Sequence, residues 1–206
     1  LETVPRVRIP PSPPRPEAQL KSWAFFDLIT PINIAYKFMI ALNYRIATLD
    51  DLPRIVEIYN STIASRVVTA DLEPVSVESR IPWFNEHKSD SRPLWIVEDS
   101  LGSGIGWVSF QSFYGRPAYN ATVEVSIYFD ESARGKGYGK QTLKHCIDIA
   151  PHYGVKTLLG FIFSHNIASL KLFEHFGFKE WANLPNIALL DNEERSLTIM
   201  GLRIAP

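Results

Sequence analysis

The chain has 206 residues, 46% of them hydrophobic, which suits one globular domain with a sizeable core. Its net charge of −1 gives no sign of a nucleic-acid or anionic-membrane partner. The single cysteine, Cys146, excludes an internal disulfide framework and a cysteine zinc site, and it fits a cytoplasmic location.

Residues 1–42 differ in composition from the rest of the chain. The first sixteen residues contain six prolines, which predicts an extended segment. The apolar stretch that follows is interrupted by Asp27, Pro31 and Lys37, which argues against a bilayer-spanning helix. We expect residues 1–42 to be an irregular extension outside the working domain. It is either a genuine disordered tail or upstream DNA translated in error, with the natural start at Leu42.

A regular pattern of strands and helices begins at Asn43. The predicted strands cover residues 44–47, 94–99, 104–113, 121–129, 156–163, 178–184 and 195–204. Four helices are predicted. The first follows a Thr48–Asp51 capping box, and the second covers residues 76–89 with Ile81, Trp83 and Phe84 inward. The third runs from the glycine loop to about Ala150, and the fourth from the Asn166 cap to Gly177. This order predicts an α/β (α+β) domain over residues 43–206, with a central mixed, mostly antiparallel sheet flanked by helices.

A glycine-rich loop, RGKGYG at residues 134–139, joins the fourth strand to the third helix. Its spacing fits neither a P-loop nor the G-x-G-x-x-G dinucleotide fingerprint. Glycines let a ligand approach the main chain, and the unpaired N–H groups at a helix start attract anions. Because Arg134, Lys136 and Lys140 add positive charge, we predict a diphosphate site; a plain flexible turn is the alternative.

The loop resembles the Arg/Gln-x-x-Gly-x-Gly/Ala motif of the GNAT acetyltransferases. Further segments look like the phosphinothricin acetyltransferase branch of that family: IYNSTIASRVVTAD (58–71), WF (83–84), RPAYNATVEVSIY (116–128) and NIASLKLFEHFGF (166–178). The resemblance covers about residues 43–204. It implies the GNAT fold, acetyl-CoA in the cleft between strands 4 and 5, and a homodimer.

The resemblance also implies a set of cofactor contacts. Main-chain amides of the loop hold the pyrophosphate, and main-chain groups of the fourth strand pair with the pantetheine arm and the thioester oxygen. Asn166 either contacts the cofactor arm or only caps its helix. The expected cofactor-binding residues are Val125, Ile127, Tyr128, Arg134, Gly135, Lys136, Gly137, Tyr138, Gly139, Lys140 and Asn166.

Glu124 is the candidate catalytic residue. It lies in the middle of an apolar strand, where a buried carboxylate is costly unless it has a partner or a function. Because an ammonium must lose its proton before it attacks a thioester, Glu124 is our general base, directly or through water. The glutamate of the corresponding TVE motif has that role in the branch that the chain resembles. An ion-paired or outward-facing strand glutamate is the alternative.

One position departs from the family pattern. Many GNAT enzymes have a tyrosine, and the phosphinothricin branch often a histidine, where this chain has Phe173. Since phenylalanine cannot donate a proton, the general acid for the departing thiolate is open. Tyr128, Tyr138 or water could replace it, and unassisted departure as thiolate is also chemically reasonable.

The acceptor side is predicted by resemblance alone. The segment 112–119 is expected to line the acceptor pocket, with Arg116 or Tyr119 available to an amino-acid carboxylate and Ser65 as a further contact. Arg116 is equally compatible with an ordinary exposed loop residue. Cys146 falls on an apolar helix stripe and is predicted to be core rather than nucleophile. The five histidines show no metal-ligand spacing.

These patterns predict an acetyl-CoA-dependent N-acetyltransferase that acts by direct transfer in a ternary complex. The acceptor expected is the primary amine of a small amino acid or analogue, such as phosphinothricin, methionine sulfone or methionine sulfoximine. Two alternatives stay open: acetylation of peptide N-termini or aminoglycosides, and a non-catalytic acyl-CoA-binding module.

Overall fold

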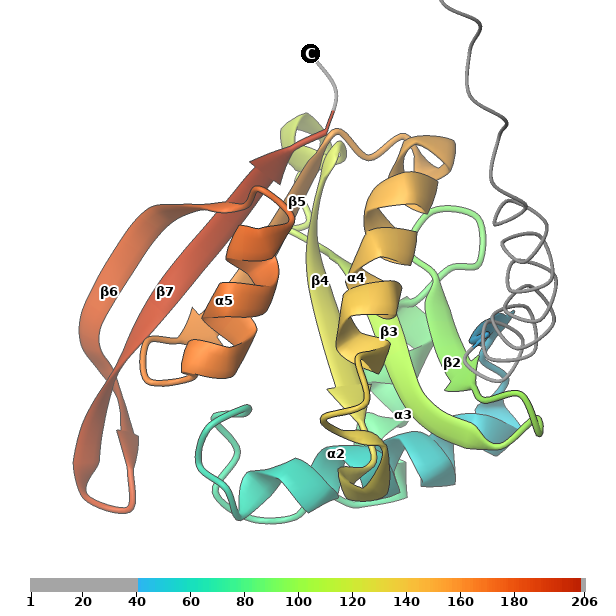
Figure 1. The fold of residues 1–206 in the computed structure, drawn as a ribbon, viewed down its shortest axis with the longest axis horizontal. Helices are drawn as coiled ribbons and strands as arrows, with labels where there is room; N and C mark the ends of the chain where they lie inside the picture. Colours follow the sequence, from blue (N-terminus) through green and yellow to red (C-terminus); the bar gives the residue numbers. More distant parts are fainter. Residues whose placement is uncertain (1–40, 205–206) are drawn as a thin grey trace, which may run out of the picture. The chain divides into compact units, whose positions relative to one another are not determined.

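The computed structural model describes residues 41–204 (Figure 1). The strands are β1 (Asn43–Ile46), β2 (Leu94–Glu98), β3 (Gly104–Ser112), β4 (Thr122–Phe129), β5 (Thr157–Phe163), β6 (Lys179–Leu190) and β7 (Glu193–Arg203). The helices are α2 (Leu52–Ile63), α3 (Val77–Glu86), α4 (Tyr138–Ile149) and α5 (Ile167–His175). The predicted order of elements is confirmed. The extension predicted for residues 1–42 lies outside the described residues except for its last two, so that boundary stays a prediction.

The strands form one seven-stranded sheet in the order β1-β2-β3-β4-β5-β7-β6. Every neighbouring pair is antiparallel except β4 and β5, which are parallel and joined through α4. The predicted mixed sheet is therefore confirmed. The parallel pair is also the place where the sheet opens, because only Thr122–Glu124 of β4 pair with Thr157–Leu159 of β5. Beyond Glu124, the β5-facing edge of β4 has no strand neighbour.

Each face of the sheet carries its own core. On one face, Val123 and Val125 of β4 pack with Leu143 and Cys146 of α4. On the other, β2 and β3 pack against the buried face of α2, with Leu52, Ile55, Ile96 and Trp107 among the members of that cluster. Cys146 is fully buried, so its prediction as a core residue is confirmed. Adjacent residues of β4 thus point to opposite faces, as its alternating sequence predicts.

The prediction for α3 was partly wrong. The helix ends at Glu86 rather than near residue 89, and Ile81 is exposed, while Trp83 and Phe84 pack against the α2 core as expected. The inward stripe passes through Val77, and residues at i+3 and i+4 spacing share one helix face. Arg80, three residues from Val77 and from Trp83, lies on that stripe, which places it beside the sheet.

The last two strands are longer than predicted and form a hairpin. Asp191 and Asn192 make its turn with φ angles of 48° and 66°. Two successive left-handed residues are typical of a tight hairpin turn, and Asp and Asn tolerate this conformation better than most residues. Because the turn contains no glycine, its sequence signal was weak. Within residues 41–204, no helix has the length and apolar character that crossing a bilayer requires.

Candidate active site

A cleft of about 240 Å³ opens where β4 and β5 separate. Glu124 to Phe129 line one side and Gly160 to Ile162 of β5 line the other, with Arg134 and Gly139 at the glycine loop. Residues of α2, of the segment after it and of α5 with its cap complete the walls: Thr62, Val68, Asn166, Ser169, Leu172 and Phe173. The cleft therefore follows the unpaired edge of β4 from Glu124 toward the start of α4.

The glycine loop presents a run of free main-chain donors at that start. Gly135 and Gly137 have φ angles of 73° and 81°, which side chains rarely allow, and Gly137 is the N-cap of α4. Within the described chain, none of the N–H groups of residues 135–139 donates a hydrogen bond, whereas the next two amides both donate to the Gly137 carbonyl. Unpaired amides at a helix start, with the positive end of the helix dipole, form an anion site.

The side chains of the loop differ in what they do. Arg134 donates from Nε to the Phe129 carbonyl and from Nη2 to Ser61 Oγ, both at 3.0 Å, so it fastens the loop to β4 and α2. Lys136 and Lys140 are exposed and free to meet an anion. The Tyr138 side chain packs against the core beneath α4, so only its main-chain N–H is left for the predicted contact with the cofactor.

Asn166 caps α5 as one of its two predicted roles, and its contact with the cofactor arm stays a prediction. Its Oδ1 accepts from Ser169 N at 3.1 Å and caps α5, while its Nδ2 donates to the Val67 carbonyl at 3.3 Å. It is 7% exposed and lines the cleft. The neighbouring His165 contacts the Arg66 carbonyl through Nε2 at 2.9 Å. The segment after α2 is thereby tied to the far side of the cleft.

Phe173 is buried and forms part of the cleft wall. Its ring lies so close to β5 that a Cβ at Gly160 would come within 2.4 Å of Phe173 Cε1. We expect Gly160→Ala to lower the free energy of unfolding by about 1–3 kcal/mol, because overpacking forces the ring or the strand to move. Urea unfolding measures this effect, and an unchanged midpoint would show that the ring has room to shift.

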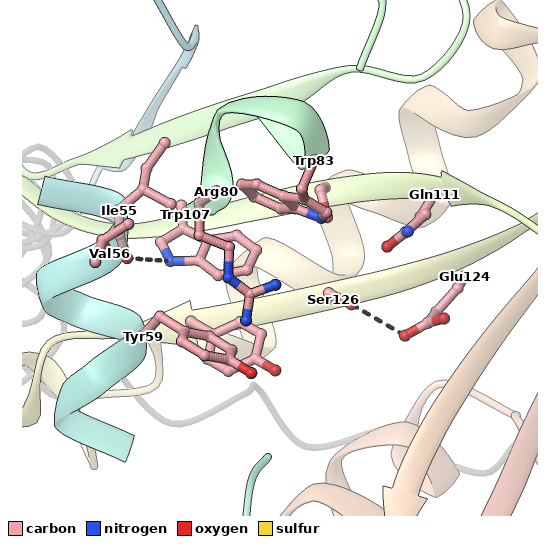
Figure 2. Close-up of a pocket in the computed structure, with 11 residues that line it drawn as sticks. Ile55, Val56, Tyr59, Arg80, Trp83, Trp107, Gln111, Glu124 and Ser126 are labelled. Carbon is pink, nitrogen blue, oxygen red and sulfur yellow. Dashed lines mark hydrogen bonds between the residues drawn. The ribbon is translucent and has the colours of Figure 1, made fainter. Parts of the chain in front are cut away.

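A second cavity of about 230 Å³ lies on the other face of β4, between the sheet and helices α2 and α3 (Figure 2). Four aromatic, two aliphatic and five polar or charged residues line it: Tyr59, Trp83, Trp107 and Tyr128, then Ile55 and Val56, then Arg80, Ser109, Gln111, Glu124 and Ser126. Three residues, Glu124, Ser126 and Tyr128, line both cavities. The two spaces therefore meet along β4.

Glu124 lies at this meeting point. It is partly buried, and its Oε1 accepts one hydrogen bond, from Ser126 Oγ at 3.2 Å. Burial raises the pKa of Glu124 above its usual value, and the Ser126 bond opposes that shift in part. Among residues 41–204 it forms no salt bridge, so the ion-paired alternative finds no partner there. A shielded carboxylate of this kind can take up a proton.

Arg80 is the arginine that lines the second cavity, and sequence reasoning missed it. Its Nη2 donates to Asp71 Oδ2 at 2.7 Å, and its guanidinium lies 4.7 Å from the centre of the Tyr59 ring. Tyr59 also bonds Asp71, together with Thr69. The signal was present in the sequence, since Arg80 lies one helical turn before the inward Trp83.

Ser109 and Gln111 were also missed. They alternate with Val108 and Phe110 on β3, so they share a face with Trp107. The strand register places Ser109 opposite Ser126 and Gln111 opposite Glu124. Had the alternation of 104–113 been followed as it was for β4, these two polar residues would have been predicted beside Glu124.

The three predicted acceptor residues border neither cavity. Arg116 and Tyr119 are exposed in the β3–β4 connection, where Tyr119 stacks edge-on with Phe113. Ser65 is exposed after α2, and its hydroxyl donates to the Thr62 carbonyl. Within the described chain, no hydrogen bond connects these residues to Glu124, so their role in acceptor binding stays a prediction.

Comparison with known proteins identifies the family. Residues 41–179, more than half of the chain, match the domain described as "Acetyltransferase (GNAT) domain". The chain belongs to the GNAT acetyltransferases. A protein of Bacillus subtilis strain 168 named "Putative phosphinothricin acetyltransferase YwnH" is 52% identical over 164 residues, which cover 80% of this chain and 100% of that protein.

The names of two further relatives print a substrate and a cofactor of those proteins. An "L-methionine sulfoximine/L-methionine sulfone acetyltransferase" of Pseudomonas aeruginosa is 30% identical, over 79% of this GNAT chain and 94% of that protein. The crystal structure of a phosphinothricin acetyltransferase of Sinorhizobium meliloti in complex with AcCoA superposes with a TM-score of 0.73 at 26% identity, over 79% and 88% of the two chains. The predicted family, fold and enzyme class, an N-acetyltransferase, are confirmed.

Proposed function

We propose that this enzyme transfers the acetyl group of acetyl-CoA to the primary amine of a small amino acid or amino-acid analogue. The observation that carries the proposal is that two cavities on opposite sides of β4 share Glu124, Ser126 and Tyr128. A thioester in the cleft and an amine in the second cavity would meet beside one carboxylate. The names of the relatives from Pseudomonas aeruginosa and Sinorhizobium meliloti support this acceptor class.

The cleft and the glycine loop at its end fit acetyl-CoA. The free amides of residues 135–139, with Lys136 and Lys140, suit a diphosphate. The unpaired edge of β4 suits the pantetheine arm, because an amide-bearing chain can add to a sheet edge as a strand does. In this arrangement Val125, Ile127 and Tyr128 contribute main-chain groups, and Asn166 lies beside the arm.

Glu124 acts as the general base in the proposed reaction. Bound acetyl-CoA supplies an activated acetyl group. Glu124 accepts a proton from the ammonium, directly or through a water, and leaves a neutral amine whose lone pair can attack. The nitrogen–carbon bond then forms, and the carbon–sulfur bond breaks with the electron pair leaving on sulfur. The attacking nitrogen loses its second proton, which neutralises the thiolate or passes to water. A main-chain N–H of β4 near Val125–Ile127 stabilises the negative charge on the acetyl oxygen during the transfer.

Tyr128 is the proton donor that the geometry favours for the departing sulfur. It lines both cavities, whereas Tyr138 lines neither and packs on the α4 core. Burial raises the pKa of Tyr128, so the phenol is protonated at neutral pH but is a weaker acid than a thiol. Because a thiol of pKa about 8.5 is a fair leaving group, we expect its contribution to be modest.

Direct transfer agrees with the state of the single cysteine. Cys146 is completely buried, and burial raises the pKa of its thiol. A buried thiol of raised pKa is a poor nucleophile, so Cys146 is not suited to carry the acetyl group in a covalent intermediate. The proposed order is therefore a ternary complex of enzyme, acetyl-CoA and amine.

The second cavity favours a small acceptor over the alternatives. Its volume of about 230 Å³ and its aromatic walls give little room for an aminoglycoside or a peptide. Arg80 lines this cavity together with Glu124, and the positive charge of Arg80 opposes the binding of a polycation. A non-catalytic binding module would have no need for a shielded carboxylate at the junction of two cavities.

A panel of amines tests the proposal. We expect release of free coenzyme A thiol with amino acids and their analogues, and little with aminoglycosides, polyamines or a peptide N-terminus. Mass spectrometry without an amine should detect no acetylated enzyme. Thiol release from an aminoglycoside or peptide alone, or the absence of release with every amine, would contradict the proposed acceptor class.

We further propose a homodimer in the cytoplasm. The edge strand β6 exposes Trp181, Ile187 and Leu189, and apolar side chains grouped on a sheet edge favour association. A reducing compartment keeps Cys146 as a thiol. Light scattering after size-exclusion chromatography measures the mass, and a mass near one chain would contradict the dimer.

A further inference from the structure

The segment that follows α2, residues 66–71, connects the two cavities, and we call it the strap. Val68 lines the cleft, whereas Thr69 and Asp71 bond the hydroxyl of Tyr59, which lines the second cavity. Within the described chain, residues 67–75 form no main-chain to main-chain hydrogen bond. The position of the strap therefore depends on the side chains that hold it.

One group of contacts fastens the strap on the cofactor side. The Arg66 carbonyl lies 2.9 Å from His165 Nε2, and this nitrogen must carry the proton because a carbonyl can only accept. The Val67 carbonyl accepts from Asn166 Nδ2 at 3.3 Å. The Arg66 guanidinium forms an ion pair at 2.7 Å with Asp191 of the β6–β7 turn. His165 and Asp191 line neither cavity, although both contact the strap.

A second group of contacts joins the strap to the acceptor side. Asp71 Oδ2 accepts from Arg80 Nη2 at 2.7 Å and from the Tyr59 hydroxyl. Tyr59 and Arg80 both line the second cavity, and Figure 2 shows the Arg80 guanidinium over the Tyr59 ring, 4.7 Å from its centre. One carboxylate of the strap thus holds two side chains of this cavity.

The backbone of the strap begins in a conformation that needs support. Arg66 has a φ of 53°, in the left-handed region, which is unfavourable for a residue other than glycine. Such a conformation persists where surrounding contacts fix it, and strained residues of this kind gather at functional sites. The Arg66 guanidinium also bonds the Ile63 and Leu72 carbonyls. The protein thus maintains a strained turn that sets the direction of the strap.

We propose that His165 and Asp191 are positioning residues for the acceptor, and that they act through the strap on Arg80 and Tyr59. Resting on the proposed function, this makes the acceptor cavity depend on the β5–α5 connection and on the β6–β7 turn, from which none of its lining residues comes. When an anchor is lost, Asp71 is free to move, and acceptor binding must order the two cavity side chains again. That cost weakens the affinity for the acceptor but leaves the bound amine beside its base.

His165→Ala tests the first anchor, with an amine that the wild type acetylates. The acceptor KM should rise about two- to tenfold, the cost of ordering one side chain, while kcat changes by less than about twofold. His165→Gln keeps an N–H donor at a similar reach and should restore the acceptor KM. His175→Ala, an exposed histidine at the end of α5, is the matched control and should change neither constant.

The affinity for coenzyme A distinguishes positioning of the acceptor from a general loosening of the site. Among the described residues, no hydrogen bond joins the strap to residues 135–139 or to β4. The Kd for coenzyme A, measured by calorimetry, should therefore change by less than about twofold in His165→Ala.

Asp191→Gly tests the second anchor without disturbing the turn. Glycine adopts the φ of 48° at this position freely, so the substitution removes only the carboxylate that Arg66 bonds. Because Asp191 is largely exposed, we expect a smaller rise in the acceptor KM, about two- to fivefold. Asn192→Gly, at a φ of 66° in the same turn, is the matched control and should leave the KM unchanged.

The outcomes separate the two proposals. An unchanged acceptor KM in folded His165→Ala and Asp191→Gly overturns the positioning role and leaves the proposed function standing. An equal rise of the acceptor KM and of the Kd for coenzyme A overturns it as well. A thermal melt shows whether each variant folds, and if His165→Ala does not, Asp191→Gly decides alone. The absence of acetylation with every amine in the wild type overturns both proposals.

Discussion

Glu124→Gln is expected to lower kcat about 10²- to 10⁴-fold at neutral pH, the range that general acid–base catalysis contributes. Glutamine keeps the size and one hydrogen-bond acceptor of the side chain but cannot take the ammonium proton. Coenzyme A affinity should stay unchanged, because the proposed cofactor contacts are main-chain groups and the glycine loop. Stopped-flow or steady-state thiol release gives kcat, and calorimetry gives the affinity.

The pH dependence separates a base from a merely structural carboxylate. Because burial raises the pKa of Glu124, the acid limb of kcat/KM should lie above the ordinary glutamate value and disappear in Glu124→Gln. Glu174→Gln, on the exposed face of α5, should retain the limb. If Glu124→Gln turned over at the wild-type rate with the same acid limb, another group would have to be the base.

Glu124→Gln should raise the stability of the protein at neutral pH, although it lowers the activity. A carboxyl whose pKa is higher in the folded protein binds protons more tightly there, so wild-type stability falls as pH rises from the unfolded pKa through the folded one. Glutamine does not titrate. We therefore expect Glu124→Gln to be more stable than wild type at pH 7 and equal to it below about pH 4, the ordinary glutamate range. A melting curve at each pH measures the difference.

The sequence predicts the fold well because its elements carry local signals. The capping box at Thr48, the alternation of β4 and the Asn166 cap each depend on neighbours a few residues away, and the structure confirms all three. The errors fall where the local signal was weak or misread. Ile81 is apolar but lies off the inward stripe of α3, and the Asp191–Asn192 turn lacks the glycine that usually marks a hairpin.

The candidate site was predictable where one segment forms it and less so where several do. Glu124 and the glycine loop belong to one strand–loop–helix unit, so their proximity follows from sequence order. The second cavity combines α2, α3 and β3, and its assembly depends on the register that sets Ser109 and Gln111 beside β4. The spacing from Trp83 places Arg80 on the inward stripe of α3, but the sequence of α3 does not show that Tyr59 of α2 lies opposite it.

Gly137→Ala is expected to weaken coenzyme A binding about tenfold or more, the effect of losing one hydrogen bond to a charged group. At a φ of 81°, a side chain strains the backbone by about 1–2 kcal/mol. The loop can relax only by rotating the peptides on either side of residue 137. That rotation turns the free amides of residues 135–139 away from a shared anion, so the Kd measured by calorimetry should rise.

Gly102 provides a matched control in the turn between β2 and β3. Its φ is 78°, and a Cβ there meets nothing within 4 Å, as at Gly137. Gly102→Ala should therefore lose a similar 1–2 kcal/mol of stability by the same strain, measured by urea unfolding, and bind coenzyme A as the wild type does. Equal losses of affinity in the two variants would show that general destabilisation, rather than the orientation of the loop amides, weakens binding. An unchanged affinity in Gly137→Ala would remove these amides from the diphosphate site.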